Sequence, residues 1–192
     1  MGEPTGMRGQ SPVPGAHSRR RFLAMLGAAG AGLAGLPSGL LADPGPRVVR
    51  FRHLHTDERL TTEYYARGRY VPDALADVDR ILRDWRTGDV HVIAPDLLDT
   101  LHALAQAVGT QQPFQVISGY RSPATNAMLR RTGGGGVASA SLHMQGMAID
   151  IRLADVPLRR LRDAALGLRR GGVGYYPSSD FVHVDTGRVR TW

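Results

Sequence analysis

The 192-residue sequence contains no cysteine. This absence excludes disulfide bonds, zinc sites built from thiolates and a cysteine nucleophile. It also excludes a lipoprotein anchor, because that anchor requires a cysteine at the start of the mature chain. Any chemistry in this protein therefore has to rest on other side chains.

Lysine is absent as well, so all 24 basic residues are arginine. They outnumber the 17 acidic residues and give a formal net charge of +7 at pH 7. No basic helix interleaved with aromatic residues accompanies this charge, which argues against nucleic acid as the partner. A mildly basic surface suits an acidic cell-wall polymer, although charge steers association without identifying the partner.

The sequence also lacks a hydrophobic run long enough for a membrane helix. The apolar stretch from Phe22 to Leu36 ends at Pro37 and is shorter than the roughly 20 residues that span a bilayer. Before it, residues 18–24 read SRRRFLA, which resembles a twin-arginine export signal. A signal peptide, cleaved near Ala42, is therefore favoured over a membrane anchor.

These features divide the chain into two parts. Residues 1–45 are expected to be a disordered N-terminus followed by the twin-arginine signal peptide. Residues 46–192 are expected to form one domain, located in the periplasm or elsewhere outside the cytoplasm. We expect no stable membrane span after removal of the signal.

The pattern of apolar residues in the second part predicts an α+β fold. Hydrophobic residues make up 42% of the sequence and charged residues 21%, which is enough for a packed core. The periodicity predicts helices and strands in an order typical of a small, largely antiparallel sheet with helices packed on it. The expected helices cover 72–85, 95–108, 126–131 and 158–168, and the expected strands cover 47–54, 60–65, 114–117, 146–153, 173–176 and 181–185.

Two short motifs near the C-terminal end place histidine and aspartate among apolar strand residues. One is SLHMQGMAID, with His143 and Asp150, and the other is FVHVD, with His183. Apolar strands do not normally carry such groups without partners, because burying an unpaired polar group is costly. Catalytic zinc sites combine three protein ligands, often histidine and carboxylate, with one open position. These three residues are therefore candidate metal ligands, whereas either motif alone would indicate a hydrogen-bonded structural pair.

A third segment, SGYRS at residues 118–122, carries Arg121. The three motifs together resemble the M15-type zinc metallopeptidases, part of the LAS group, in a branch that includes murein endopeptidases. The resemblance covers roughly residues 47–192, and the motifs occur in the family's order. It implies a LAS/hedgehog-type fold, Zn²⁺ bound by His143, Asp150 and His183, and contact between Arg121 and the substrate carbonyl. A guanidinium suits that role because it is permanently charged and donates hydrogen bonds in a fixed fork.

The resemblance leaves the general base open. Relatives have a glutamate three residues before the last histidine ligand or a histidine two residues before it, and here these positions hold Asp180 and Phe181. Asp185 follows His183 by two residues, so strand alternation points both side chains to one face. We expect Asp185 to be the base or to support the metal ligand, with Asp180 as the second candidate. A solvated turn explains Asp180 equally well.

Aromatic residues and the other histidines receive structural interpretations. Tyr175 and Tyr176 are expected to pack in the core rather than to line a cleft. His53 and His55 are expected to be surface or packing residues. A serine nucleophile is not indicated, because no His/Asp pair accompanies a particular serine.

The function expected from these residues is that of an exported zinc-dependent peptidase. It would hydrolyse peptidoglycan stem peptides or cross-links, as a murein endopeptidase. The alternatives are a carboxypeptidase of the same family and a non-catalytic, zinc-containing module that binds the cell wall. Arg121 and an acidic residue beside the metal favour an enzyme, because only turnover requires them. The cleaved bond and the oligomeric state are left open.

Overall fold

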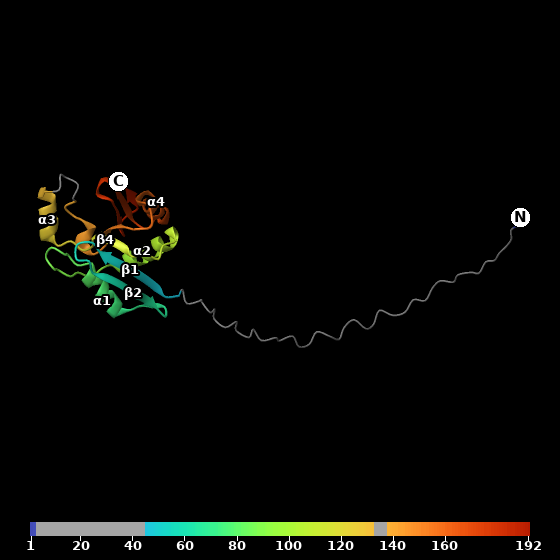
Figure 1. Ribbon diagram of the computed structural model, residues 1–192, viewed down its shortest axis with the longest axis horizontal. Helices are drawn as coiled ribbons and strands as arrows, with labels where there is room; N and C mark the ends of the chain where they lie inside the picture. Colours follow the sequence, from blue (N-terminus) through green and yellow to red (C-terminus); the bar gives the residue numbers. More distant parts are fainter. Residues whose placement is uncertain (3–44, 133–137) are drawn as a thin grey trace, which may run out of the picture. The chain divides into compact units, whose positions relative to one another are not determined.

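The structure, a computed structural model, describes residues 1–2, 45–132 and 138–192 (Figure 1). Of the segment 1–45, which is expected to contain a disordered N-terminus and the twin-arginine signal peptide, only residues 1–2 and 45 belong to this described part. The unit that contains the site spans Ala42–Trp192. Within the described residues, no helix is long and apolar enough to cross a membrane.

An eight-stranded sheet with the order β3-β2-β1-β4-β5-β7-β6-β8 forms the centre of this unit. Adjacent strands run antiparallel except in the pairs β1–β4 and β6–β8, which are parallel. This architecture confirms the expected α+β class with a largely antiparallel sheet. The strands are β1 (Arg47–His53), β2 (Arg59–Ala66), β3 (Arg69–Tyr70), β4 (Phe114–Ser118), β5 (Ala148–Arg152), β6 (Gly172–Tyr176), β7 (Phe181–Asp185) and β8 (Arg190–Thr191). The strands β3 and β8 are not predicted from the sequence, because two residues are too few to show alternation of apolar and polar side chains.

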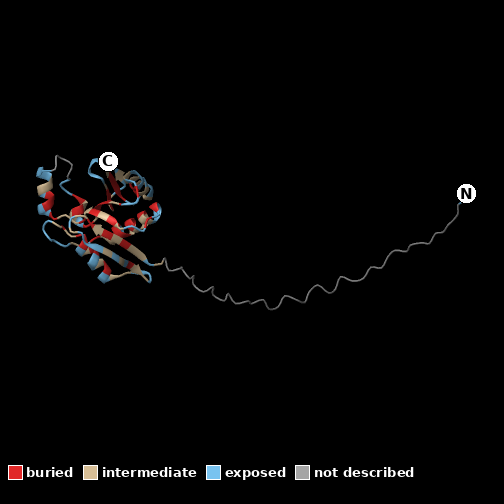
Figure 2. Cartoon of the chain, viewed as in Figure 1, coloured by how far each residue is buried: buried red, intermediate tan, exposed pale blue. Residues whose placement is uncertain are grey.

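Three helices supply the hydrophobic core with its second layer. They are α1 (Pro72–Ile81), α2 (Pro95–Val108) and α4 (Leu158–Leu168). Helix α1 contacts β2, α2 contacts β1 and α4, and α4 contacts β6 and β7. The side chains of Leu101, Leu104 and Leu161 are fully buried in one cluster with strand residues. Figure 2 colours buried residues red, and such residues occur in both the helices and the strands. Helix α3 (Pro123–Thr132) lies at the side of the domain in Figure 1.

Helix α1 ends four residues earlier than the apolar spacing predicts. The backbone N–H of Asp84 donates to the carbonyl of Asp89 at 2.9 Å instead of continuing the helix. Trp85, the last apolar residue of the pattern, therefore leaves the helix and stacks on His55, with ring centroids 4.1 Å apart. Helix α2, by contrast, ends where expected, at Val108, and is followed by Gly109 in the left-handed conformation.

Candidate metal centre

The candidate ligands come together because of the register between β5 and β7. These antiparallel neighbours place Asp150 directly opposite His183. Ile149 and Val182, next to them in sequence, belong to the hydrophobic core. Since side chains alternate along a strand, Asp150 and His183 point to the face of the sheet opposite that core.

His143 reaches the same place from the turn that leads into β5. It lies on a short 3₁₀ helix, Leu142–Gln145, which ends at Gly146 with a φ of 65°. A Cβ atom at Gly146 would lie 2.1 Å from the carbonyl oxygen of Val92, so only glycine fits there. The GxxxD spacing from Gly146 to Asp150 therefore reflects a tight turn followed by strand alternation.

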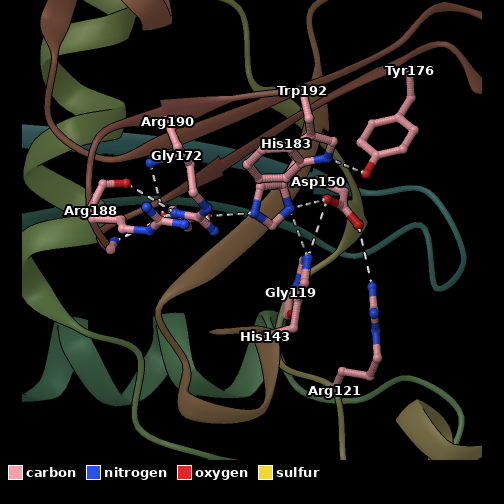
Figure 3. A network of polar contacts seen from close by, with 12 residues as sticks. Gly119, Arg121, His143, Asp150, Gly172, Tyr176, His183, Arg188, Arg190 and Trp192 are labelled. Carbon is pink, nitrogen blue, oxygen red and sulfur yellow. Dashed lines mark hydrogen bonds and ion pairs between the residues drawn. The ribbon is translucent and has the colours of Figure 1, made fainter. Parts of the chain in front are cut away.

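The three predicted ligands form one buried cluster (Figure 3). The Nδ1 atom of His183 lies 2.9 Å from Oδ1 of Asp150 and 3.1 Å from Nε2 of His143. Nε2 of His143 lies 3.2 Å from the same carboxylate oxygen. One ligand atom from each residue lies within 4.8 Å of the others. The geometry can therefore hold one metal ion.

In each of the two histidine rings, the hydrogen bond made by one nitrogen determines that the other nitrogen carries the free lone pair. Nδ1 of His143 lies 2.7 Å from the carbonyl oxygen of Gly119, to which it can only donate. Nε2 of His183 donates in the same way to Oδ2 of Asp185 at 3.0 Å. Both remaining nitrogens then face the Asp150 carboxylate as acceptors. Three acceptors at such distances repel unless a cation or a proton lies between them, so this donor set fits a divalent metal.

The pKa shifts of His183 and Asp150 also indicate that positive charge is favoured at this place. Burial alone would lower the pKa of His183, but its hydrogen bonds to Asp150 and Asp185 raise it to about 9. Burial would raise the pKa of Asp150, yet the charges and hydrogen bonds of His143 and His183 hold it well below its usual range. Both directions have the same cause, which is the close approach of these groups, and a bound metal ion would supply positive charge at the same place.

Asp185 is buried behind His183, with 0% of its surface exposed. Its carboxylate accepts a bidentate pair of hydrogen bonds from Arg190, at 3.0 and 2.7 Å. The backbone N–H groups of Gly172 and Gly187 also donate to it. Although burial would raise the pKa of Asp185, these hydrogen bonds keep it far below the usual value. The carboxylate contacts the ring nitrogen of His183 that faces away from His143 and Asp150.

Asp180, the other candidate base, lies at a different place. It follows the short 3₁₀ helix Pro177–Ser179 and has a left-handed backbone with a φ of 54°. Its carboxylate accepts a hydrogen bond from Arg152 at 2.5 Å, and 60% of the side chain is exposed. Asp180 is not among the described residues that line the cavity at the ligand cluster.

Arg121 lies beside the cluster, with Nη2 3.5 Å from Oδ2 of Asp150 and 11% of its side chain exposed. Among the described residues, its Nε atom has no hydrogen-bond partner. Burial lowers its pKa, an effect opposed first by the charge of Asp150. The guanidinium therefore keeps donors available for a further oxygen atom.

The loop that carries Arg121 is held by the segment after α1. The N–H of Tyr120 donates to the carbonyl of Leu82 at 2.7 Å, and the N–H of Ser122 donates to the buried carboxylate of Asp84 at 2.9 Å. Gly119 packs so closely that an added Cβ atom would lie 2.5 Å from the Leu82 oxygen. Asp84 is a positioning residue that no sequence motif indicated, because the contact joins segments 38 residues apart.

A cavity of about 670 Å³ opens at the cluster. Aromatic side chains form part of its lining, namely Tyr176, Phe181 and Trp192. The interpretation of Tyr176 as a core residue is therefore wrong, whereas Tyr175 packs against the core as expected. Arg190 and Trp192 also line the cavity, and their proximity to the site comes from the pairing of β8 with β6, which the sequence pattern did not reveal.

The α+β fold and the buried His/Asp/His cluster beside an arginine define a domain with a candidate metal centre open to a cavity. The chain belongs to the M15 peptidase family described as peptidoglycan L,D-endopeptidase MepK, which matches residues 42–192. The family membership confirms the resemblance indicated by the three motifs.

The chain is similar to two relatives over nearly their whole length. It is 44% identical to the probable peptidoglycan L,D-endopeptidase MepK of Haemophilus influenzae, over 91% of this chain and 95% of that protein. It is 42% identical to the peptidoglycan L,D-endopeptidase MepK of Escherichia coli K12, over 91% of this chain and 97% of that protein. A solved structure, the L-Ala D-Glu endopeptidase ChiX of Serratia marcescens, shares 22% identity with a TM-score of 0.32, covering 41% of this chain and 62% of that one.

Proposed function

We propose that this protein is a zinc-dependent endopeptidase that hydrolyses peptidoglycan cross-links or stem peptides. The observation that carries the proposal is the convergence of His143, Asp150 and His183 on one point at the wall of a cavity. The names of the two relatives support peptidoglycan as the substrate, with a bond between an L- and a D-centre as the one cleaved.

In this proposal His143 provides Nε2, His183 provides Nδ1 and Asp150 provides a carboxylate oxygen to a zinc ion. Three protein ligands of these types leave one position open, as in catalytic zinc sites. When bound, the ion supplies Lewis-acid polarisation of the scissile carbonyl and lowers the pKa of a water molecule toward 7.

Arg121 is proposed to donate hydrogen bonds to the carbonyl oxygen of the scissile peptide. Its unpartnered Nε atom and its permanent charge support this role, because negative charge develops on that oxygen as the carbonyl is attacked. Loss of one such donor typically lowers kcat by about 100- to 1,000-fold.

Asp185 is proposed to be a positioning residue rather than the general base. It holds His183 so that Nε2 carries the proton and Nδ1 carries the lone pair. As a carboxylate on the far side of that ring, with Arg190 bound bidentately, it has no free oxygen directed toward the ligand cluster.

The test is to incubate the purified protein with isolated sacculi, with and without a chelator, and to separate the fragments by mass spectrometry. We expect peptide fragments that appear with zinc, disappear with the chelator and return when zinc is restored. The His143→Ala variant should lose both zinc and fragments. The matched control is His102→Ala, because His102 lies on α2, outside the cluster.

The outcomes separate the proposed function from its alternatives. Release of free terminal D-alanine alone would indicate a carboxypeptidase. Zinc and sacculus binding without any fragment would indicate a wall-binding module. If cleavage persists at full rate in metal-free protein, the zinc-dependent mechanism is refuted.

We also propose that the twin-arginine segment around Arg19 and Arg20 exports the folded domain. A reporter fused to residues 1–45 should reach the periplasm, and Arg19→Lys with Arg20→Lys should retain it in the cytoplasm. Unchanged export of the double variant would contradict this pathway.

A further inference from the structure

A row of residues crosses the sheet from the metal ligands to Trp192. Asp150 on β5 pairs with His183 on β7, and His183 pairs with Gly174 on β6. Because Val173 pairs with Thr191 in the parallel β6–β8 pair, the next residues, Gly174 and Trp192, are also neighbours. All four residues lie in one line across adjacent strands.

Glycine at position 174 allows the indole to reach the ligand cluster. A Cβ atom there would lie 2.7 Å from Cε2 of Trp192, which is closer than real side-chain contacts permit. With that space free, the Trp192 indole lies over the strand, and its ring centroid is 5.2 Å from that of His183. A glycine inside a strand thus marks a close approach.

The indole N–H has a defined partner at the cavity. Nε1 of Trp192 donates to the hydroxyl of Tyr176 at 2.6 Å (Figure 3). Indole nitrogen is a donor only, so the tyrosine oxygen is the acceptor in this bond. The hydroxyl proton of Tyr176 is not used in it, and the direction of that proton is restricted by the bond that the oxygen already accepts.

The position of the Tyr176 ring is also fixed. It stacks on Phe181, with ring centroids 4.5 Å apart, and both rings line the cavity that contains the ligand cluster. Arg121 lines the same cavity as Tyr176. In Figure 3 the Asp150 carboxylate lies between the Tyr176 ring and the Arg121 side chain.

We propose that the Tyr176 hydroxyl is a second hydrogen-bond donor to the scissile carbonyl oxygen, and that Trp192 is the positioning residue that fixes its direction. The inference rests on the proposed peptidase function. No proton is transferred in this step, because the hydroxyl only donates a hydrogen bond that strengthens as charge develops on the oxygen. Such a donor acts from a fixed position, which the Trp192 and Phe181 contacts provide.

The test compares three single variants of the full chain. Tyr176→Phe removes only the hydroxyl, and Trp192→Phe removes the indole N–H together with the five-membered ring while it keeps one aromatic ring. The matched control is Tyr175→Phe, since Tyr175 is the neighbouring tyrosine on the opposite, core-facing side of β6. Zinc content and melting temperature are measured for each variant together with kcat and KM on a soluble cross-linked muropeptide.

We expect Tyr176→Phe to lower kcat by about 10- to 100-fold with KM changed less than about threefold, as for a donor that acts in the transition state. Tyr175→Phe should retain wild-type kcat. Trp192→Phe should lower kcat by a smaller factor and should add almost nothing in the Tyr176→Phe background, because both changes then affect the same hydroxyl.

Binding supplies a second measurement that does not depend on turnover. A phosphinate analogue of the cleaved peptide mimics the tetrahedral centre, and its Kd should rise about tenfold in Tyr176→Phe but not in Tyr175→Phe. A Tyr176→Phe variant with wild-type kcat would overturn the inference, and so would a change confined to KM. If the wild-type protein itself cleaves no peptidoglycan, it is the proposed function that fails.

Discussion

The substitution Asp185→Asn changes the support of the metal site without changing the volume of the side chain. In the native protein both carboxylate oxygens accept hydrogen bonds, from His183, from Arg190 and from two backbone N–H groups. An asparagine offers one acceptor oxygen and one donor nitrogen in the same space. In either orientation the NH₂ group faces a hydrogen-bond donor, from which it cannot accept a hydrogen bond.

The expected effect on zinc binding follows from the histidine tautomer. If the new NH₂ group faces His183, the ring proton has to move to Nδ1, the atom directed at Asp150 and His143. If it takes the place of Oδ1, it meets Nη1 of Arg190 and the backbone N–H groups of Gly172 and Gly187, all of which are donors. Loss of such outer partners typically weakens metal binding by about 10- to 100-fold, which is about 1.4 to 2.7 kcal/mol.

The assay is a competition between the protein and a chromophoric chelator for zinc at pH 7.5, followed by kinetics at saturating zinc. The control is Asp180→Asn, because Asp180 is exposed and binds only Arg152, an ion pair worth at most about 1 kcal/mol. We expect weaker zinc binding in Asp185→Asn, recovery of most of its kcat at high zinc, and no change of zinc affinity in Asp180→Asn.

Two results would refute this reasoning. Zinc affinity equal to wild type in Asp185→Asn would show that the hydrogen bond to His183 does not support the ligand. A large loss of kcat in the fully zinc-loaded Asp185→Asn variant would show that Asp185 does more than support zinc binding. The same loss in Asp180→Asn would instead assign the base to Asp180.

Three further predictions concern the parts that support the site. His53 is completely buried and its pKa is lowered to about 4, chiefly by burial. Between pH 6.5 and 4 the unfolded chain therefore binds a proton at His53 that the folded chain does not bind. Urea titrations of the metal-free protein should show that the free energy of unfolding decreases by up to about 3 kcal/mol as the pH falls through this range. Asp84→Ala should lower the free energy of unfolding by about 1 to 3 kcal/mol, because the N–H of Ser122 loses its buried acceptor. The variant should also have a lower kcat, while its zinc content stays that of the wild type. Gly119→Ala should lower the melting temperature by several degrees, since its Cβ atom would meet the backbone oxygen of Leu82 at 2.5 Å, and a wild-type melting curve would contradict this.

Much of the fold could be predicted from local patterns. Helix α2 begins at Pro95 and ends at Val108 as its apolar spacing and end residues indicate, and β7 alternates core and site residues as a strand should. Local patterns failed where a distant contact determined the structure. Helix α1 stops early because Asp84 bonds to Asp89, and β8 forms only because β6 is there to pair with it.

The sequence by itself determined the chemistry that is possible at the site. With no cysteine, histidine and aspartate are the candidate metal ligands, and strand alternation already places Asp185 on the same face as His183. Which groups act together was decided only by the tertiary structure, because hydrogen bonds join atoms that are near in space rather than in sequence. The sheet register places Asp150 against His183 and brings Trp192 and Tyr176 to the wall of the cavity. No local pattern contains that information, since it depends on which strands become neighbours.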